Sequence, residues 1–234
     1  MYYITSSSSV SHQPTFRNKS FSKSISTLAD GSSLIRPDYK ESINSDMLRR
    51  MSEIIRMSIS CALDCLMQSE IKQPEGIIVG SGLGCLYDTE KFLSNIINIK
   101  KGLIPPTSFI QSTHNAIAGQ ISLVLGNHNY NMTHTQNTIS FEHALLDACL
   151  NLDEGKENIL VGGADEYIKP LNAIANQLGY DNVLLTSGAS FFVIAKKKKE
   201  KSRILIRSTK TFGLINSLTD CVDEFLEENK LDIK

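Results

Sequence analysis

Short apolar runs suited to β-strands alternate with longer amphipathic segments suited to α-helices along most of this chain. The clearest helical segment spans residues 46–67, where Met, Leu and Ile recur at spacings near three and four. A glycine-bounded run of β-branched residues follows at 76–80, and such a run is typical of a strand buried on both faces of a parallel sheet. This alternation predicts an α/β fold in which helices cover a sheet.

The same alternation continues toward the C-terminus. The tract at 6–45 is rich in Ser, Asn and Pro, and we expect it to be a long excursion, that is, a connection without regular secondary structure. Ser45 is the expected N-cap of the first helix. Strands that alternate with helices imply a mostly parallel sheet covered on both faces, with an antiparallel strand allowed at its end. The expected strands are residues 2–5, 76–80, 130–135, 158–163 and 189–195, and the expected helices are 46–67, 88–98, 115–125 and 140–152.

Residues 203–211 alternate like one more strand, and residues 217–229 carry apolar side chains in helical register. These two segments look like the start of a second unit, and the sequence ends before a following strand could form. We therefore expect a first domain over residues 1–200 and an incomplete second unit over residues 201–234.

Charge and hydropathy exclude two classes of partner. The chain has 24 basic and 25 acidic residues, and its one dense basic run, at 196–199, is best explained as a solvated loop. No stretch approaches the roughly 18 apolar residues that span a bilayer, and the N-terminus lacks the basic region and apolar core of a signal peptide. We expect a cytoplasmic protein with neither a nucleic acid nor a membrane as partner.

The residues that usually hold metals and nucleotides do not form complete motifs. The five cysteines make no C-x-x-C pair, and no histidine is spaced to complete a zinc site. The Gly-Ser-Gly-Leu-Gly turn at 80–84 follows a strand, but its third glycine comes one residue early for a dinucleotide-binding turn. A tight turn with close backbone packing explains it better, so we expect no metal and no cofactor.

The junction between the strand at 130–135 and the helix near residue 140 is the most informative place. At such a junction backbone N–H groups and the helix dipole point at the turn, where they lower a thiol pKa and stabilise an oxyanion. The turn at 132–138 reads Met-Thr-His-Thr-Gln-Asn-Thr and contains neither cysteine nor serine.

Six segments, taken in order, resemble the N-terminal half of the β-ketoacyl synthases of the thiolase-like superfamily. The resemblance covers roughly residues 1–195 and is strongest to the divergent ketosynthase-like proteins of aryl-polyene and flexirubin-type pathways. It implies a thiolase-like half-fold with a mixed, mostly parallel five-stranded sheet and helices on both faces. The segments are residues 48–52, 76–84, 106–115, 140–145, 160–166 and 188–194.

The resemblance places a nucleophilic cysteine on the turn after the third strand, and this chain departs from that pattern. Counting back from Ala144 puts the position at His134. If the alignment gap is placed on the other side of the turn, the nucleophile position falls on Gln136. Chain-length factors and decarboxylating ketosynthases likewise carry Gln in place of Cys. The family also takes two histidines from its C-terminal half, which this sequence does not reach. We therefore expect no condensation by this chain alone.

The resemblance further implies a dimer along the sheet edge near the third strand. The first hypothesis is a chain-length-factor-like subunit that pairs with a catalytic ketosynthase, or with itself, and works with an acyl carrier protein. The alternatives are an active 3-oxoacyl-[acyl-carrier-protein] synthase of which this is a piece, a Gln-type malonyl decarboxylase, and a small nucleotide-binding α/β protein. The expected interface residues are Ser112, Thr113, His114, Asn115, Tyr130, Met132, His134 and Gln136.

Overall fold

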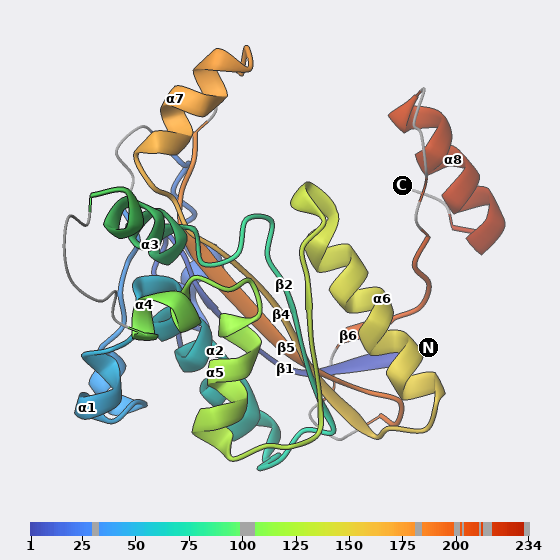
Figure 1. The fold of residues 1–234 in the computed structure, drawn as a ribbon. Helices are drawn as coiled ribbons and strands as arrows, with labels where there is room; N and C mark the ends of the chain where they lie inside the picture. Colours follow the sequence, from blue (N-terminus) through green and yellow to red (C-terminus); the bar gives the residue numbers. More distant parts are fainter. Residues whose placement is uncertain are drawn as a thin grey trace.

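A six-stranded sheet forms the centre of the protein in the computed structural model (Figure 1). The structure describes residues 1–29, 33–98, 106–180, 184–198, 202, 204–210, 212 and 217–231. The strands are β1 (Tyr2–Val10), β2 (Gly76–Gly80), β3 (Tyr130–His134), β4 (Asn158–Asp165), β5 (Gly188–Ala195) and β6 (Ile204–Ile206). The helices are α1 (Ser45–Leu48), α2 (Glu53–Ser69), α3 (Leu86–Asn98), α4 (Pro106–Gln111), α5 (Ala116–Leu125), α6 (Ser140–Asp153), α7 (Pro170–Gln177) and α8 (Leu218–Asn229). Three short 3-10 helices are η1 (Phe21–Lys23), η2 (Tyr39–Glu41) and η3 (Asn137–Ile139).

The strands lie in the order β3-β2-β4-β5-β1-β6. β2 runs parallel to β3 and β4, whereas β5 is antiparallel to β4 and β1, and β6 is antiparallel to β1. Strands β1 to β4 therefore share one direction, which confirms the mixed, mostly parallel sheet. All five strands predicted for this sheet are present. A sixth, β6, lies within the segment 203–211, predicted as the strand of a second unit, and it pairs with Tyr2, Tyr3 and Ile4 of the same sheet.

Helices cover both faces of the sheet, and alternate side chains of each central strand supply the two cores. Ile77 and Val79 of β2 point to the core shared with α2 and α5, whereas Ile78 points to the core shared with α6. In Figure 1, α2 and α5 accordingly lie on one side of the sheet and α6 on the other. The run predicted to be buried on both faces is fully buried, as expected for a central strand.

The serine-rich start of the chain is a longer strand than the sequence predicted. Residues 6–10 continue β1 instead of opening the excursion, after a register shift between Ile4 and Ser6. Two buried hydroxyl groups of this strand have partners inside the protein, since Thr5 Oγ1 donates to the Val193 carbonyl at 3.0 Å and Ser6 Oγ to the Cys65 carbonyl at 2.8 Å. Small polar side chains with hydrogen-bond partners are thus compatible with a buried strand.

The predicted helix at 46–67 is interrupted and forms α1 and α2. The guanidinium of Arg56 donates twice to the carbonyl of Leu48, at 3.2 and 2.7 Å, and so binds a carbonyl at the end of α1. Asn44, not Ser45, caps α1, because its side chain accepts from the amide of Asp46 at 2.8 Å. No described helix is long and apolar enough to cross a membrane.

Candidate functional site

The parallel strands β2, β3 and β4 end side by side, at Gly80, His134 and Asp165. In open α/β sheets, ligand sites lie beyond the carboxyl ends of the parallel strands. The turn after β2, the junction after β3 and the acidic end of β4 therefore surround the first candidate site.

Asp165 fixes the glycine-rich turn after β2. Its Oδ1 accepts from the amide of Gly82 at 2.8 Å and from Ser81 Oγ at 3.2 Å. Gly84 has a φ of +66°, and a Cβ there would lie 2.4 Å from Nδ1 of His114. The turn thus serves close packing, as predicted, and His114 lies against it.

A buried carboxyl group lies behind this turn. Oε1 of Glu166 accepts from the amide of Tyr87 at 2.9 Å. Burial, opposed by the hydrogen bond from the Tyr87 amide and reinforced by the nearby charges of Asp88, Glu53 and Asp165, raises the pKa of Glu166 to about 7. In the described part of the chain, no group of three or more His, Cys, Asp or Glu is placed to hold a metal ion.

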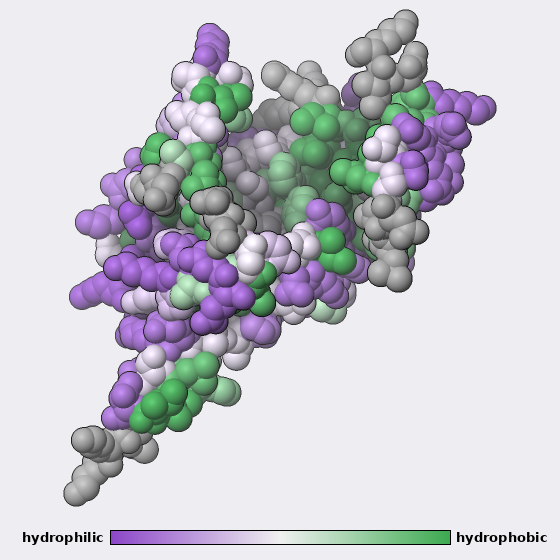
Figure 2. Space-filling model, turned by 90° about the horizontal axis from the view of Figure 1, so that it is seen from above, coloured by the Kyte–Doolittle hydropathy of each residue, from purple (hydrophilic) through white to green (hydrophobic). Residues whose placement is uncertain are grey.

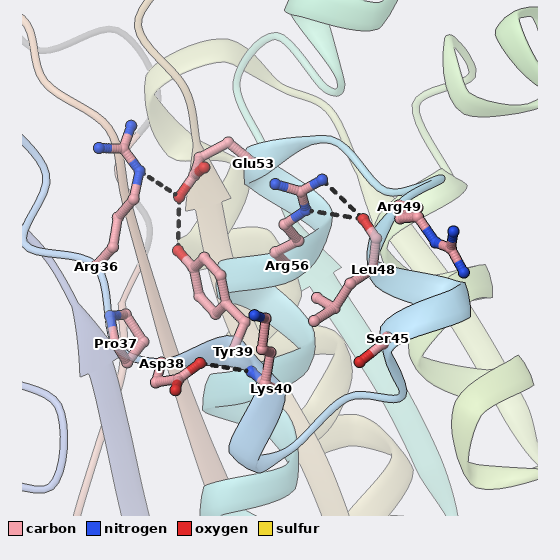
Figure 3. Close-up of a pocket in the computed structure, with 10 residues that line it drawn as sticks. All are labelled: Arg36, Pro37, Asp38, Tyr39, Lys40, Ser45, Leu48, Arg49, Glu53 and Arg56. Carbon is pink, nitrogen blue, oxygen red and sulfur yellow. Dashed lines mark hydrogen bonds and ion pairs between the residues drawn. The ribbon is translucent and has the colours of Figure 1, made fainter.

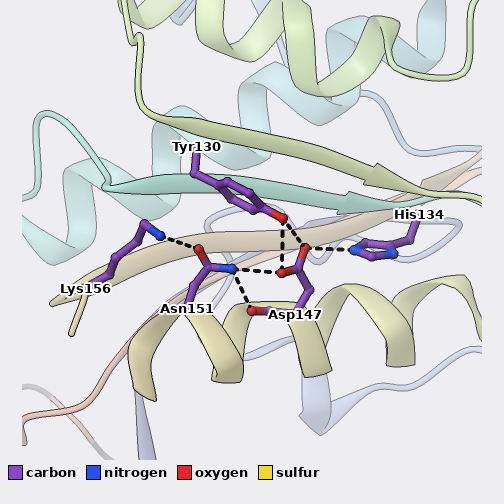
Figure 4. Close-up of polar contacts among 5 residues, drawn as sticks. All are labelled: Tyr130, His134, Asp147, Asn151 and Lys156. Atoms are coloured by element: carbon purple, nitrogen blue, oxygen red, sulfur yellow. Dashed lines mark hydrogen bonds and ion pairs between the residues drawn. The ribbon is translucent and has the colours of Figure 1, made fainter. Parts of the chain in front are cut away.

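His134 ends β3 and is held by a carboxylate of α6 (Figure 4). Its Nε2 lies 2.8 Å from Oδ2 of Asp147, and the two side chains are 20% and 16% exposed. Tyr130, at the other end of β3, donates its hydroxyl to the same carboxylate, 3.0 Å from Oδ2 and 3.2 Å from Oδ1. The ring of His134 is thus paired with a carboxylate and not with a thiol or hydroxyl.

Two more side chains complete this network, which we call the Asp147 cluster. Asn151 Nδ2 donates to Asp147 Oδ1 at 2.8 Å. Lys156 donates to Oδ1 of Asn151, and its Nζ lies 5.1 Å from the centroid of the Tyr130 ring. Sequence reasoning missed Asp147, although Asp147 is a polar residue within a helix whose buried face also carries Ala144 and Ala148.

The other predicted nucleophile position has a different environment. The side chain of Gln136 is exposed on the turn, and its backbone N–H donates to Ser140 Oγ at 2.8 Å. Ser140 Oγ donates in turn to the carbonyl of Asn137, whose φ of 51° is left-handed. The structure thus separates the two alternatives: an anchored imidazole at His134 and a free amide at Gln136.

Four of the five cysteines do not supply an activated thiol. Cys61, Cys65, Cys85 and Cys149 are buried, whereas Cys221 of α8 is partly exposed and lines a hollow with Ile139. Burial raises the pKa of Cys61 to about 12 and that of Cys149 to about 11. These groups stay protonated at neutral pH, whereas a nucleophilic cysteine must reach the thiolate.

The predicted interface residues lie in two places. Ser112 to Asn115 connect α4 to α5, and Thr89 Oγ1 fastens this connection by donating to the Ser112 carbonyl at 2.9 Å. The following helix, α5, packs on β2 and β3. Tyr130, Met132 and His134 lie on β3, which ends the sheet and pairs only with β2 among the described strands.

A second concave site, the cationic pocket, lies between η2, α1 and the start of α2 (Figure 3). It measures about 600 Å³. Glu53 accepts from Arg36 Nε at 3.0 Å and from the Tyr39 hydroxyl at 2.6 Å. Four cationic and two acidic residues line it, so its net charge is positive: Arg36, Lys40, Arg49 and Arg56 against Asp38 and Glu53.

An apolar hollow of about 780 Å³ lies between α6 and α8. Figure 2 shows apolar side chains gathered in this hollow, with hydrophilic ones on the outer side of α8. Leu145 and Leu146 of α6 face Val222 and Phe225 of α8 across it. The sequence predicted the helix α8, and its N-cap is Ser217, which accepts from the amide of Asp220.

Solved structures share this fold at low sequence identity. No curated protein sequence matches the chain. The ketosynthase ApeO in complex with its chain length factor ApeC from Xenorhabdus doucetiae matches with a TM-score of 0.66 and 19% identity, over 84% of this chain and 79% of that chain. The ishigamide ketosynthase/chain length factor matches with a TM-score of 0.69 and 18% identity, over 83% and 62%.

A third match is AntDE:AntF, a type II PKS acyl-carrier protein in complex with its ketosynthase bound to the hexaketide. Its TM-score is 0.61 and its identity 17%, over 83% of this chain and 62% of that chain. This chain thus spans about three fifths of the length of the second and third matches. The three structures confirm the predicted thiolase-like ketosynthase fold.

The family comparison agrees with the fold. The profile of the family described as Beta-ketoacyl synthase, N-terminal domain matches residues 36–205, which is more than half of the chain. The chain therefore belongs to the beta-ketoacyl synthase family, through its N-terminal domain.

Proposed function

We propose that this chain is a non-catalytic, chain-length-factor-like subunit that pairs with a catalytic ketosynthase during chain elongation on an acyl carrier protein. One observation carries the proposal: the turn after β3, where the family holds its nucleophilic cysteine, has no cysteine, and of the two candidate positions His134 is anchored to Asp147 and Gln136 is an amide. An imidazole bound to a carboxylate supplies no thiol to carry an acyl chain. The resemblance is strongest to proteins of aryl-polyene and flexirubin-type pathways, and we place the subunit in the cytoplasm.

Two of the structural neighbours support a ketosynthase partner, since each combines a ketosynthase with a chain length factor. The alignment with the first match covers 84% of this chain and 79% of the matched chain, so the two chains are similar in length. A chain of about this size therefore has a structural counterpart in such a complex.

The outer edge of β3 is the surface that we propose for pairing. β3 has a free edge in the described part of the sheet, and an unpaired edge is a template for a strand of another chain. Met132 on β3 is 40% exposed and Leu123 on the neighbouring α5 is 71% exposed. The edge thus offers main-chain hydrogen bonds beside apolar side chains.

The cationic pocket is where we place the carrier protein. Its lining has twice as many cationic as acidic residues, so it attracts a protein surface that presents carboxylates. A neighbour is a carrier protein bound to its ketosynthase. Salt above about 0.5 M should weaken this contact, because exposed charges are screened.

Gln136 favours the second candidate, a malonyl decarboxylase. Its side chain is exposed on the junction where the family holds its nucleophile, so it is free to contact a substrate. One assay with malonyl-loaded carrier protein distinguishes the chain-length-factor-like subunit from the malonyl decarboxylase.

The experiment compares the purified chain, a catalytic ketosynthase with an intact nucleophilic cysteine, and the two proteins coexpressed. The proposal expects a complex on size-exclusion chromatography with light scattering, and chain elongation by the complex but not by this chain alone. CO₂ release by this chain alone that disappears in Gln136→Ala, or a covalent acyl adduct on it, would overturn the proposal in favour of the second candidate.

A further inference from the structure

The strand that we propose for pairing is short and held by few main-chain bonds. β3 has five residues and one parallel ladder, to β2. A strand of this kind has unpaired N–H and C=O groups along its outer edge, so its shape depends on what holds its side chains. Tyr130, Met132 and His134 alternate to the same face of the sheet, which is the face covered by α6.

One carboxylate binds both ends of this strand (Figure 4). Tyr130 and His134 are the first and last residues of β3, and their Cα atoms are roughly 13 Å apart at the usual rise of a strand. Both side chains reach Oδ2 of Asp147, at 3.0 and 2.8 Å. Asp147 thus fastens the whole length of β3 to α6.

The carboxylate is fully engaged, as a partly buried charge requires. Oδ1 accepts from Asn151 and Tyr130, and Oδ2 accepts from Tyr130 and His134. Lys156 binds Asn151 and lies over the Tyr130 ring, which brings a positive charge close to the cluster. A satisfied network of this kind holds its members in one arrangement, whereas an unsatisfied one destabilises the fold.

We propose that Asp147 is a positioning residue for the pairing edge: by binding both ends of β3, it fixes the strand against α6 before the partner arrives. This inference rests on the proposed function, since it concerns the same edge. A strand that is already ordered loses less conformational entropy on binding. Asp147 therefore determines the affinity for the ketosynthase although it lies behind the edge.

The same helix offers a matched control. Asp153, two turns further along α6, accepts from the Tyr2 hydroxyl at 2.7 Å and from Lys196, and so binds the opposite part of the sheet. Asp147→Ala and Asp153→Ala remove the same group from the same helix. Only the first substitution releases β3.

The experiment measures hydrogen exchange of the amides at 130–134 in the free full-length chain and the Kd for the ketosynthase. Asp147→Ala is expected to speed exchange at these amides and to weaken binding, each about tenfold, which corresponds to about 1.4 kcal/mol in binding. Asp153→Ala should change neither by more than about twofold, and Asp147→Asn, which keeps one acceptor, should recover part of both losses.

Unchanged exchange at 130–134 in Asp147→Ala, or faster exchange with unchanged affinity, would overturn the inference alone. A wild-type chain that does not bind the ketosynthase overturns the proposed function and the pairing role of Asp147 with it. If Asp147→Ala does not fold, two milder variants give the same two readouts: Asp147→Asn, which removes one acceptor of the cluster, and Tyr130→Phe, which removes one donor.

Discussion

At the scale of single residues, Glu166 joins three parts of the structure. It follows the last residue of β4, accepts from the amide of Tyr87 at the start of α3, and lies near the charge of Glu53 in α2. It is 9% exposed, so its charged form is disfavoured and its pKa rises from 4.5 to about 7. Proton binding at Glu166 is therefore coupled to the stability of this corner of the fold.

Stability should fall as the pH rises through about 7. Because the pKa of Glu166 is higher in the folded than in the unfolded chain, the protonated group contributes stability below about 4.5, and this contribution is lost above about 7. The difference amounts to about 3 kcal/mol at most. Urea unfolding from pH 5 to 8.5 measures it, and Glu166→Gln should flatten the curve. If the free energy of unfolding changed with pH in the same way for wild type and Glu166→Gln, Glu166 would not be the source of the pH dependence.

Alanine substitutions at Gly84 and Gly126 distinguish the cost of backbone strain from the cost of steric overlap. Both have a left-handed φ, +66° and +58°, but a Cβ on Gly84 meets His114 at 2.4 Å whereas a Cβ on Gly126 meets nothing within 4 Å. Gly126→Ala should lower the free energy of unfolding by about 1 kcal/mol, and Gly84→Ala by roughly 2 kcal/mol more. Equal losses in chemical denaturation would show that His114 moves aside without cost.

At the scale of elements, the sequence predicted the central strands and the helices α2, α3, α5 and α6, because apolar periodicity records burial. It missed α4 and α7, which lie between strands but bury no side chain. It missed the serine half of β1, where the buried hydroxyl of Ser6 donates to the distant carbonyl of Cys65. It also missed the break at Leu48, which depends on the side chain of Arg56. In the site, the pattern identified the junction at His134, but its partner Asp147 became visible only when α6 was placed against β3.

The serine half of β1 provides an element-scale prediction. Ser6 is buried and donates to the Cys65 carbonyl of α2, whereas its neighbour Ser7 is exposed. Ser6→Ala should lower the free energy of unfolding by about 1 kcal/mol, the usual value of such a bond, and Ser7→Ala by less than about 0.5 kcal/mol. Thermal unfolding of the two variants measures the difference, and equal melting temperatures would mean that the bond adds no stability.

At the scale of the whole molecule, two apolar surfaces are not covered by other parts of the described structure. One is the edge of β3 with Met132 and Leu123, and the other is the apolar hollow between α6 and α8. Large apolar surfaces on soluble proteins mark contacts with other chains. The fold is thus suited to act as part of an assembly, which agrees with a subunit that has no thiol nucleophile at its central junction.

The assembly itself gives the last prediction. Binding of the ketosynthase at a concentration 100 times its Kd should stabilise this chain by about 2.7 kcal/mol, which raises its Tm by roughly 5 to 10 °C. Met132→Lys places a charge on the edge of β3, so it should reduce this shift without altering the Tm of the free chain, because the side chain is already 40% exposed. Leu178→Lys, on an exposed position just after the protruding α7 (Figure 1), is the matched control and should keep the full shift. Equal shifts for the two variants would place the partner on a surface other than β3.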